Sequence, residues 1–132
     1  MKKGYHTPIE QITKENTDFR RVLYTGAHMQ LVLMTLGVAE EIGMEVHEEN
    51  DQFFRFESGL GTVIVGDTEY HVGDGDAIIV PAGTQHNVMN TGSEPLTLYT
   101  IYAPAHHKDG IVRATKQEAI DNEAAFDGTT TE

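Results

Sequence analysis

The central part of the chain consists of short apolar runs, rich in β-branched, aromatic and leucine residues, that are separated by glycine, aspartate and asparagine. This punctuation is typical of an all-β domain. It predicts strands over residues 19–25, 29–36, 44–47, 52–58, 61–65, 68–72, 77–80, 86–90 and 96–102. Gly66 and Asp67 lie between two of these strands and predict a two-residue hairpin turn, because glycine readily adopts a positive φ.

Helices are expected only outside this strand-rich part. Thr115 and Glu118 have the spacing of a capping box, in which Thr115 caps a backbone amide and Glu118 reaches back. The motif predicts a C-terminal helical tail over about 115–126, with the helix itself at about 116–125. Its apolar stripe is expected to comprise Ala119, Ile120 and Ala124.

The whole chain, residues 1–132, is expected to form one domain, because 132 residues and 14.6 kDa are close to the usual size of one. Its core is expected at about 19–102. In front of that core, Thr7 is a candidate cap and Pro8 tolerates the first helical position, so a single helical turn is expected there.

Charge and cysteine content narrow the range of functions. Lys and Arg number 9 against 21 Asp and Glu, and the net charge of −12 disfavours nucleic acid and anionic membranes as partners. With no cysteine, the chain has no thiolate nucleophile, and any metal must be bound by His, carboxylate or amide oxygen. No apolar run is long enough for a signal peptide or a membrane span, so a cytoplasmic location is expected.

One motif in the second half of the predicted core carries specific chemical information. Its residues, at fixed spacing, are Gly75, Pro81, Gly83, His86 and Asn90. This spacing resembles the second motif of the cupin superfamily without a mismatch. The resemblance covers roughly residues 31–102 and implies a cupin double-stranded β-helix, which is a jelly-roll barrel. It also implies that His86 is a metal ligand.

The first cupin motif is recognisable in its frame but altered in its chemistry. Where cupins have a His-x-His pair, this chain has Glu45 and His47. Counting onward, Gln52 takes the place of the usual Glu, and six further residues separate it from Gly59. Asp51 would satisfy the shorter permitted spacing, but the later count would then miss the glycine. We therefore favour Gln52 over Asp51.

Strand periodicity brings these residues together, because residues two apart on a strand face the same side. Glu45 and His47 should share one face, and Gln52 should share another with Phe54 and Phe56. The set keeps the single negative charge of the usual three His and one Glu. We expect one divalent transition-metal ion, which could be Fe, Mn, Ni, Co or Zn, bound by Glu45, His47, Gln52 and His86. A metal-free, degenerate cupin is the alternative.

Other polar residues are assigned structural roles. His106 and His107 follow the last predicted strand, where neighbouring side chains point apart, so we expect a polar surface loop or lid there. Arg20 and Arg21 are expected to form salt bridges on the acidic surface, although a cation at a pocket mouth is the alternative. His71 is expected to face solvent. The acidic residues around 48–51 should disfavour polyanionic substrates.

Two functions remain open. The first is a metal-dependent enzyme, dioxygenase-like or isomerase-like, that acts on a small molecule and in which Glu45 can serve as a base. The second is a non-catalytic binding or sensing barrel. The side chains expected to enclose a ligand are Phe54, Phe56, Met34, Val88 and Tyr99. Either face of strand 96–102 could line the pocket, so Tyr99 belongs to one of two alternative sets.

Segments 45–47, 51–53 and 103–110 resemble small single-domain cupins of the mannose-6-phosphate isomerase-like group. That resemblance implies an isomerase-like site, but no phosphate clamp is evident in the sequence. The apolar segment 19–25 is an improbable free sheet edge, and we therefore expect a homodimer formed through the N-terminal strands.

Overall fold

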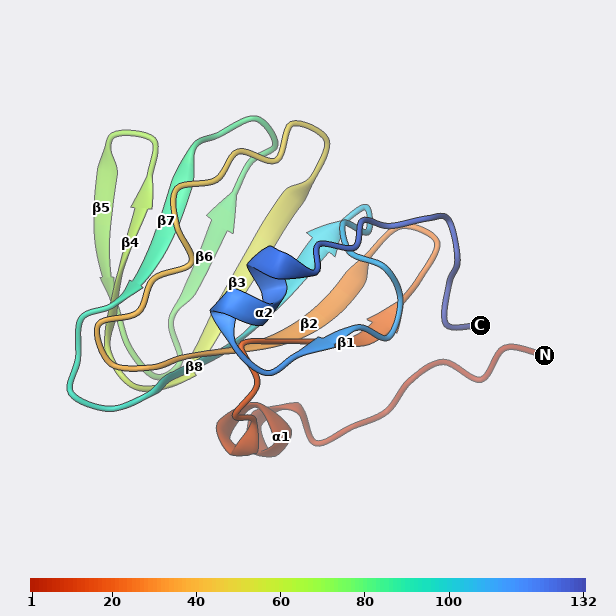
Figure 1. Cartoon of the computed structure of the whole chain (residues 1–132), viewed down its shortest axis with the longest axis horizontal. Coiled ribbons are helices and arrows are strands. Elements are labelled where there is room, and N and C mark those ends of the chain that lie inside the picture. Colours follow the sequence, from red (N-terminus) through yellow and green to blue (C-terminus); the bar gives the residue numbers. More distant parts are fainter.

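The computed structural model describes all 132 residues and consists mainly of two antiparallel sheets (Figure 1). The larger sheet has the order β6-β3-β8-β2-β1-β9 and the smaller has the order β5-β4-β7. The strands are β1 (Arg20–Thr25), β2 (Gln30–Leu36), β3 (Asp51–Ser58), β4 (Gly61–Val65), β5 (Thr68–Val72), β6 (Ala77–Val80), β7 (His86–Asn90), β8 (Leu96–Ala103) and β9 (Val112–Arg113). The helices are α1 (Ile9–Glu15) and α2 (Lys116–Asp121).

The hydrophobic core lies between the two sheets. The larger sheet contributes Phe54, Phe56 and Leu98, and the smaller contributes Val63 and Val88, all of them almost fully buried. Phe54 and Phe56 are alternate residues of β3 and Leu98 lies on β8, whereas Val63 and Val88 lie on β4 and β7, as expected for strands with one buried face. The predicted all-β jelly-roll class is confirmed, and so are the strands over 61–65, 68–72, 77–80 and 86–90.

One predicted strand is wrong. Residues 44–47 form a loop that touches β7 only through an isolated bridge between Glu45 and His86. Two backbone hydrogen bonds make this bridge, from the Glu45 amide to the His86 carbonyl at 2.8 Å and from the His86 amide to the Glu45 carbonyl at 2.9 Å. The segment is therefore fixed to the barrel, but no ladder of hydrogen bonds continues along it.

The helices differ in part from the prediction. Thr115 does cap α2, because its Oγ1 accepts a hydrogen bond from the Glu118 amide at 3.1 Å. However, α2 ends at Asp121, so Ala124 is not helical, and Ile120 is exposed. The α1 helix is longer than the expected single turn. The predicted Thr7 cap is wrong, because Pro8 occupies that position and no side chain caps the helix.

The outer edge of β1 is covered by the C-terminal part of the chain. β9 pairs with Arg20 and Arg21, and the Thr131 amide donates to the Thr25 carbonyl at 2.9 Å. Both termini lie on the same side of the molecule (Figure 1), where the amides of Lys3 and Gly4 donate to the Glu132 carboxylate. The free edge that suggested a homodimer is therefore absent, and the dimer stays a prediction.

Neither helix has the length or apolar character needed to cross a membrane.

Candidate metal centre

The polar site lies where the loop before β3 meets the start of β7. Besides the Glu45 bridge, the Gly83 amide donates to the His47 carbonyl at 2.9 Å. Gly83 has a φ of 80°, which lets the turn after β6 close tightly against this loop. Backbone contacts on both sides therefore position Glu45 and His47 next to His86.

Three side chains converge in the manner of a metal site. Glu45, His47 and His86 each offer one ligand atom, and these atoms all lie within 4.8 Å of one another. The Glu45 Oε2 and His47 Nε2 atoms are 3.0 Å apart. Burial raises the pKa of the Glu45 carboxyl, but the hydrogen bond with His47 and electrostatic interactions with His47, Arg20 and His86 outweigh it. The pKa of Glu45 is consequently below its ordinary value, and the carboxylate is ionised at neutral pH.

His86 presents a free ring nitrogen to this site. Its Nδ1 lies 3.0 Å from the Thr84 carbonyl oxygen, which only accepts, so Nδ1 carries the proton. In the neutral ring the lone pair is then on Nε2. That atom is buried and has no hydrogen-bond partner. This arrangement is the one in which a histidine is oriented as a metal ligand by a neighbouring acceptor.

Gln52 is buried opposite Tyr102, a residue whose ring contacts the cluster, whereas Asp51 is exposed. The Gln52 Nε2 donates to Thr100 Oγ1 at 3.0 Å, and its Oε1 is buried without a partner. Gln52 lies directly opposite Tyr102 in the β3–β8 register, and the Tyr102 ring contacts the His47 ring with centroids 5.7 Å apart. Asp51 is exposed and accepts a hydrogen bond from the Ala82 amide.

These residues fit a divalent metal ion. A buried nitrogen lone pair on His86 and a buried carbonyl oxygen on Gln52 lack partners, and such orphaned acceptors are costly unless something satisfies them. Glu45 adds one negative charge and His47 a second ring nitrogen. A mixed nitrogen and oxygen donor set is suited to first-row transition metals.

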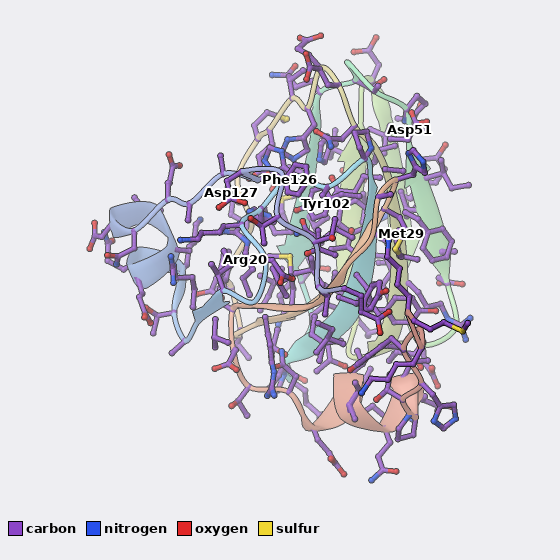
Figure 2. The ribbon with its side chains drawn as sticks, turned by 90° about the vertical axis from the view of Figure 1, so that its right-hand side faces the viewer. Arg20, Met29, Asp51, Tyr102, Phe126 and Asp127 are labelled. Atoms are coloured by element: carbon purple, nitrogen blue, oxygen red, sulfur yellow. The ribbon has the colours of Figure 1, made fainter.

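A pocket of about 250 Å³ opens beside the cluster. It is lined by Arg20, Glu45, His47, Tyr102, His106, His107, Glu123, Ala124 and Ala125. Figure 2 shows Arg20 and Tyr102 next to the C-terminal segment that carries Phe126 and Asp127, and Asp51 well away from them. The segment after α2 forms one wall, because the Phe126 amide donates to the His106 carbonyl and the Lys108 amide to the Ala124 carbonyl.

Of the two alternatives expected for His106 and His107, a surface loop or a lid, the surface loop is wrong, because both residues line the pocket. The His106 ring contacts the His47 ring with centroids 4.3 Å apart and stacks on Tyr102. His107 is buried, with Nε2 3.2 Å from the Tyr102 hydroxyl. The physical reason is Gln30, whose Oε1 accepts from both histidine amides and whose Nε2 donates to the His107 carbonyl. A polar residue in the apolar run of β2 was the signal for this contact.

Burial keeps both histidines neutral. Desolvation, followed by the positive charge of His47, lowers the pKa of His106 to about 4, although Glu45 opposes the shift. Desolvation and the charge of Arg20 lower the pKa of His107 to about 2. The pocket wall formed by these rings is therefore polar but uncharged.

The expected surface salt bridges of Arg20 and Arg21 are absent. No carboxylate lies within 4.0 Å of either guanidinium, and Arg20 lines the pocket. Arg21 points to the other face of β1, beside Leu33 and Tyr5. Two adjacent cations on a strand must face opposite sides, which was the signal that one of them turns inward.

The side chains expected to enclose a ligand lie elsewhere. Phe54, Phe56, Met34 and Val88 are fully buried in the core, and Tyr99 is half-buried near Phe53, with ring centroids 6.3 Å apart. None of the five lines the pocket beside the cluster. The other face of β8 supplies Tyr102 instead. His71 is exposed, as expected.

A family model described as a cupin domain matches residues 32–102, and the chain belongs to this family. Uncharacterized protein YrkC of Bacillus subtilis is 48% identical over 124 residues, and the match covers 89% of this chain and 67% of that protein. Uncharacterized protein L612 of Acanthamoeba polyphaga mimivirus is 38% identical over 119 residues, covering 87% of this chain and 74% of its own length. The crystal structure of BH2720 from Bacillus halodurans superposes with a TM-score of 0.89 at 46% identity, covering 91% of this chain and 96% of that one.

Proposed function

We propose that this cupin binds one divalent transition-metal ion and is a metal-dependent enzyme acting on a small molecule. Glu45, His47 and His86 would hold the ion, with the Gln52 amide oxygen as a fourth ligand. The observation that carries the proposal is the convergence of three ligand atoms within 4.8 Å, one of which is the buried, unpartnered His86 Nε2.

The chemistry of the donor set favours iron, manganese, nickel, cobalt or zinc. When bound, such an ion supplies Lewis-acid or redox chemistry. The protein contributes an ionised Glu45 that faces the pocket and can accept a proton from a bound molecule. The neutral rings of His106 and His107 and the Tyr102 hydroxyl form a wall that can orient that molecule by hydrogen bonding.

Elemental analysis of the purified protein is the direct test. We expect about one transition-metal ion per chain in the wild type and none in His86→Ala, because that variant removes the best-oriented ligand nitrogen. His71→Ala is the matched control, since His71 is exposed and lies outside the cluster. A wild type that stays metal-free after repletion with each metal in turn would contradict the proposal.

Metal binding alone does not establish catalysis, so turnover has to be measured as well. Oxygen consumption and aldose–ketose isomerisation are the two assays that the dioxygenase-like and mannose-6-phosphate isomerase-like readings call for. Each assay should compare the loaded wild type with His86→Ala. Turnover in the wild type and its loss in the variant is the expected result.

A non-catalytic binding barrel is the second candidate. The direct Glu45–His47 hydrogen bond at 3.0 Å favours it, because two of the ligand groups satisfy each other without an ion. In a non-catalytic barrel the polar cluster would orient a ligand, and the purified protein would show neither bound metal nor turnover. The homodimer and the cytoplasmic location are also proposals, which light scattering and cell fractionation would test.

A further inference from the structure

Arg20 is the one Arg or Lys side chain that lines the pocket. Its guanidinium lies 5.4 Å from the centroid of the Phe19 ring, but it makes no salt bridge within the protein. Its Nε is buried without a hydrogen bond, and no carboxylate lies within 4.0 Å of its guanidinium. In a chain with 21 acidic residues and 9 Lys and Arg, an unpaired inward-facing arginine is unexpected. A buried donor left unsatisfied costs free energy that a bound acceptor would recover.

The carboxylates nearest to Arg20 are engaged elsewhere or too distant. Glu45 shares the pocket but bonds to His47, and Glu123 lies exposed on the C-terminal wall. The backbone around Arg20 is firmly held, since β1 pairs with β2 on one side and with β9 on the other. The guanidinium is therefore presented to the pocket by a rigid strand and remains free to bind a ligand.

We infer that the pocket binds a small monocarboxylic acid, whose carboxylate pairs with Arg20 while a hydroxyl or keto oxygen at its other end faces Glu45 and His47. The carboxylate end of this inference depends on Arg20 alone. The polar end rests on the proposed metal-dependent function of the same cluster.

Charge and size select this class of ligand. The planar guanidinium fork matches a carboxylate with two parallel hydrogen bonds. A phosphate dianion would meet a single cation, the negative charge of Glu45 and a net charge of −12, which disfavour it. A volume of about 250 Å³ is small for a ligand pocket and suits a compact acid.

The electrostatic environment supports the same assignment. The positive charge of Arg20 contributes to lowering the pKa values of Glu45, His106 and His107. Its field therefore acts on three other groups that line the pocket, as expected for a guanidinium directed inward. Arg20 is the only Arg or Lys that lines the pocket and therefore its only group with a permanent positive charge.

Lactate and pyruvate, together with their uncharged amides, are suitable probes. Binding would be measured by calorimetry or by ligand-detected NMR, in both metal-free and metal-loaded protein. We expect the acids to bind the wild type more tightly than the amides do. Arg20→Gln should weaken binding of the acids by about 10- to 100-fold, the range expected for losing a charge-assisted pair. The affinity of Arg20→Lys for the acids should lie between that of the wild type and that of Arg20→Gln.

Arg21→Gln is the matched control, because it removes the same charge one residue away on the opposite face of β1. It should bind the acids as the wild type does. The inference is overturned if lactamide binds as tightly as lactate, if Arg20→Gln retains wild-type affinity, or if neither acid binds at millimolar concentration. Circular dichroism of each variant verifies folding.

The inference and the proposed function fail in different ways. If the wild type binds no metal but still prefers acids over amides through Arg20, the metal proposal is contradicted and the carboxylate assignment is supported. If the wild type binds metal but shows no Arg20-dependent preference for acids, the carboxylate assignment is contradicted and the metal proposal is supported. Arg20→Gln should retain the metal content of the wild type, because Arg20 is not among the proposed ligands.

Discussion

Gln30 and Gln52 are both buried glutamines on strands of the larger sheet, yet their amide groups are satisfied very differently. Gln30 donates to Thr25 and to the His107 carbonyl and accepts from two backbone amides. Gln52 donates once, to Thr100, and its carbonyl oxygen has no partner. The complete network around Gln30 is what a structural role requires, whereas the incomplete one around Gln52 leaves an atom available to a ligand.

The difference extends to the histidines near each glutamine. His107 is placed by Gln30, and its ring is paired with the Tyr102 hydroxyl. His86 has one ring nitrogen paired with the Thr84 carbonyl and the other unpaired. One cluster therefore forms part of the pocket wall, and the other contains the groups proposed to bind a metal ion.

The largest expected effect comes from removing the structural glutamine. Gln30→Leu would leave two amides and a carbonyl without partners in a buried site, and we expect a loss of about 3 kcal/mol or more in the free energy of unfolding. Gln52→Leu, the matched substitution, removes one hydrogen bond and an unsatisfied atom, so about 1 kcal/mol or less is expected. Urea denaturation measures both. Equal losses would contradict the distinction between the clusters.

A metal ion should stabilise the cluster that contains His86. At a free metal concentration of a hundred times Kd, the wild type should gain about 2.7 kcal/mol in the free energy of unfolding. This gain should be visible as a rise in Tm on adding the metal and should disappear with a chelator. His86→Ala should show no such rise, whereas His71→Ala should behave as the wild type. A rise in His86→Ala equal to that of the wild type would argue against His86 as a ligand.

Acid should weaken the wall of the pocket through His107. Its folded pKa of about 2 lies below the ordinary value of 6.5, so the unfolded chain takes up a proton first as the pH falls. The contribution of the neutral His107 to the free energy of unfolding is complete above pH 6.5 and decreases below it. The loss amounts to about 2 kcal/mol at pH 5.

The comparison that isolates this effect is denaturation at pH 7 and pH 5 with His107→Gln. The variant should lose about 2 kcal/mol less than the wild type between these pH values. His71→Gln is the matched control, because that side chain is exposed and lies outside the pocket. An identical pH dependence in His107→Gln and the wild type would show that His107 is not kept neutral by burial.

The smallest expected effect separates the neighbouring residues Asp51 and Gln52. Asp51→Asn should leave metal affinity nearly unchanged, because the carboxylate faces solvent and holds only the Ala82 amide. Gln52→Leu should lower metal affinity by about tenfold, since it removes the buried, unpartnered oxygen proposed as the fourth ligand. Competition with a coloured chelator measures both. Equal losses would show that the wrong oxygen has been assigned to the site.

Much of the fold followed from local pattern. Alternation along 52–58 and 96–102 predicted strands whose buried faces now carry Phe54, Phe56 and Leu98. The spacing from Gly75 to Asn90 predicted the turns that deliver His86 to the start of β7. Local pattern was misleading at 44–47, where the chain has strand-like residues but a single bridge to β7. Apolar alternation does not reveal how many neighbours a strand will find.

The sequence by itself determined the fold class and the inward face of β3, because strand period is a local property. The four side chains proposed as ligands came from the spacing that resembles the cupin motifs. The choice of Arg20 rather than Arg21 as the inward-facing cation was decided only by tertiary structure. The same is true of the burial of His106 and His107 and of the segment that covers β1. Each depends on segments more than 70 residues apart, such as Gln30 with His107 or Thr25 with Thr131. Their pairing follows from how the C-terminal segment closes over the barrel, which no local pattern encodes.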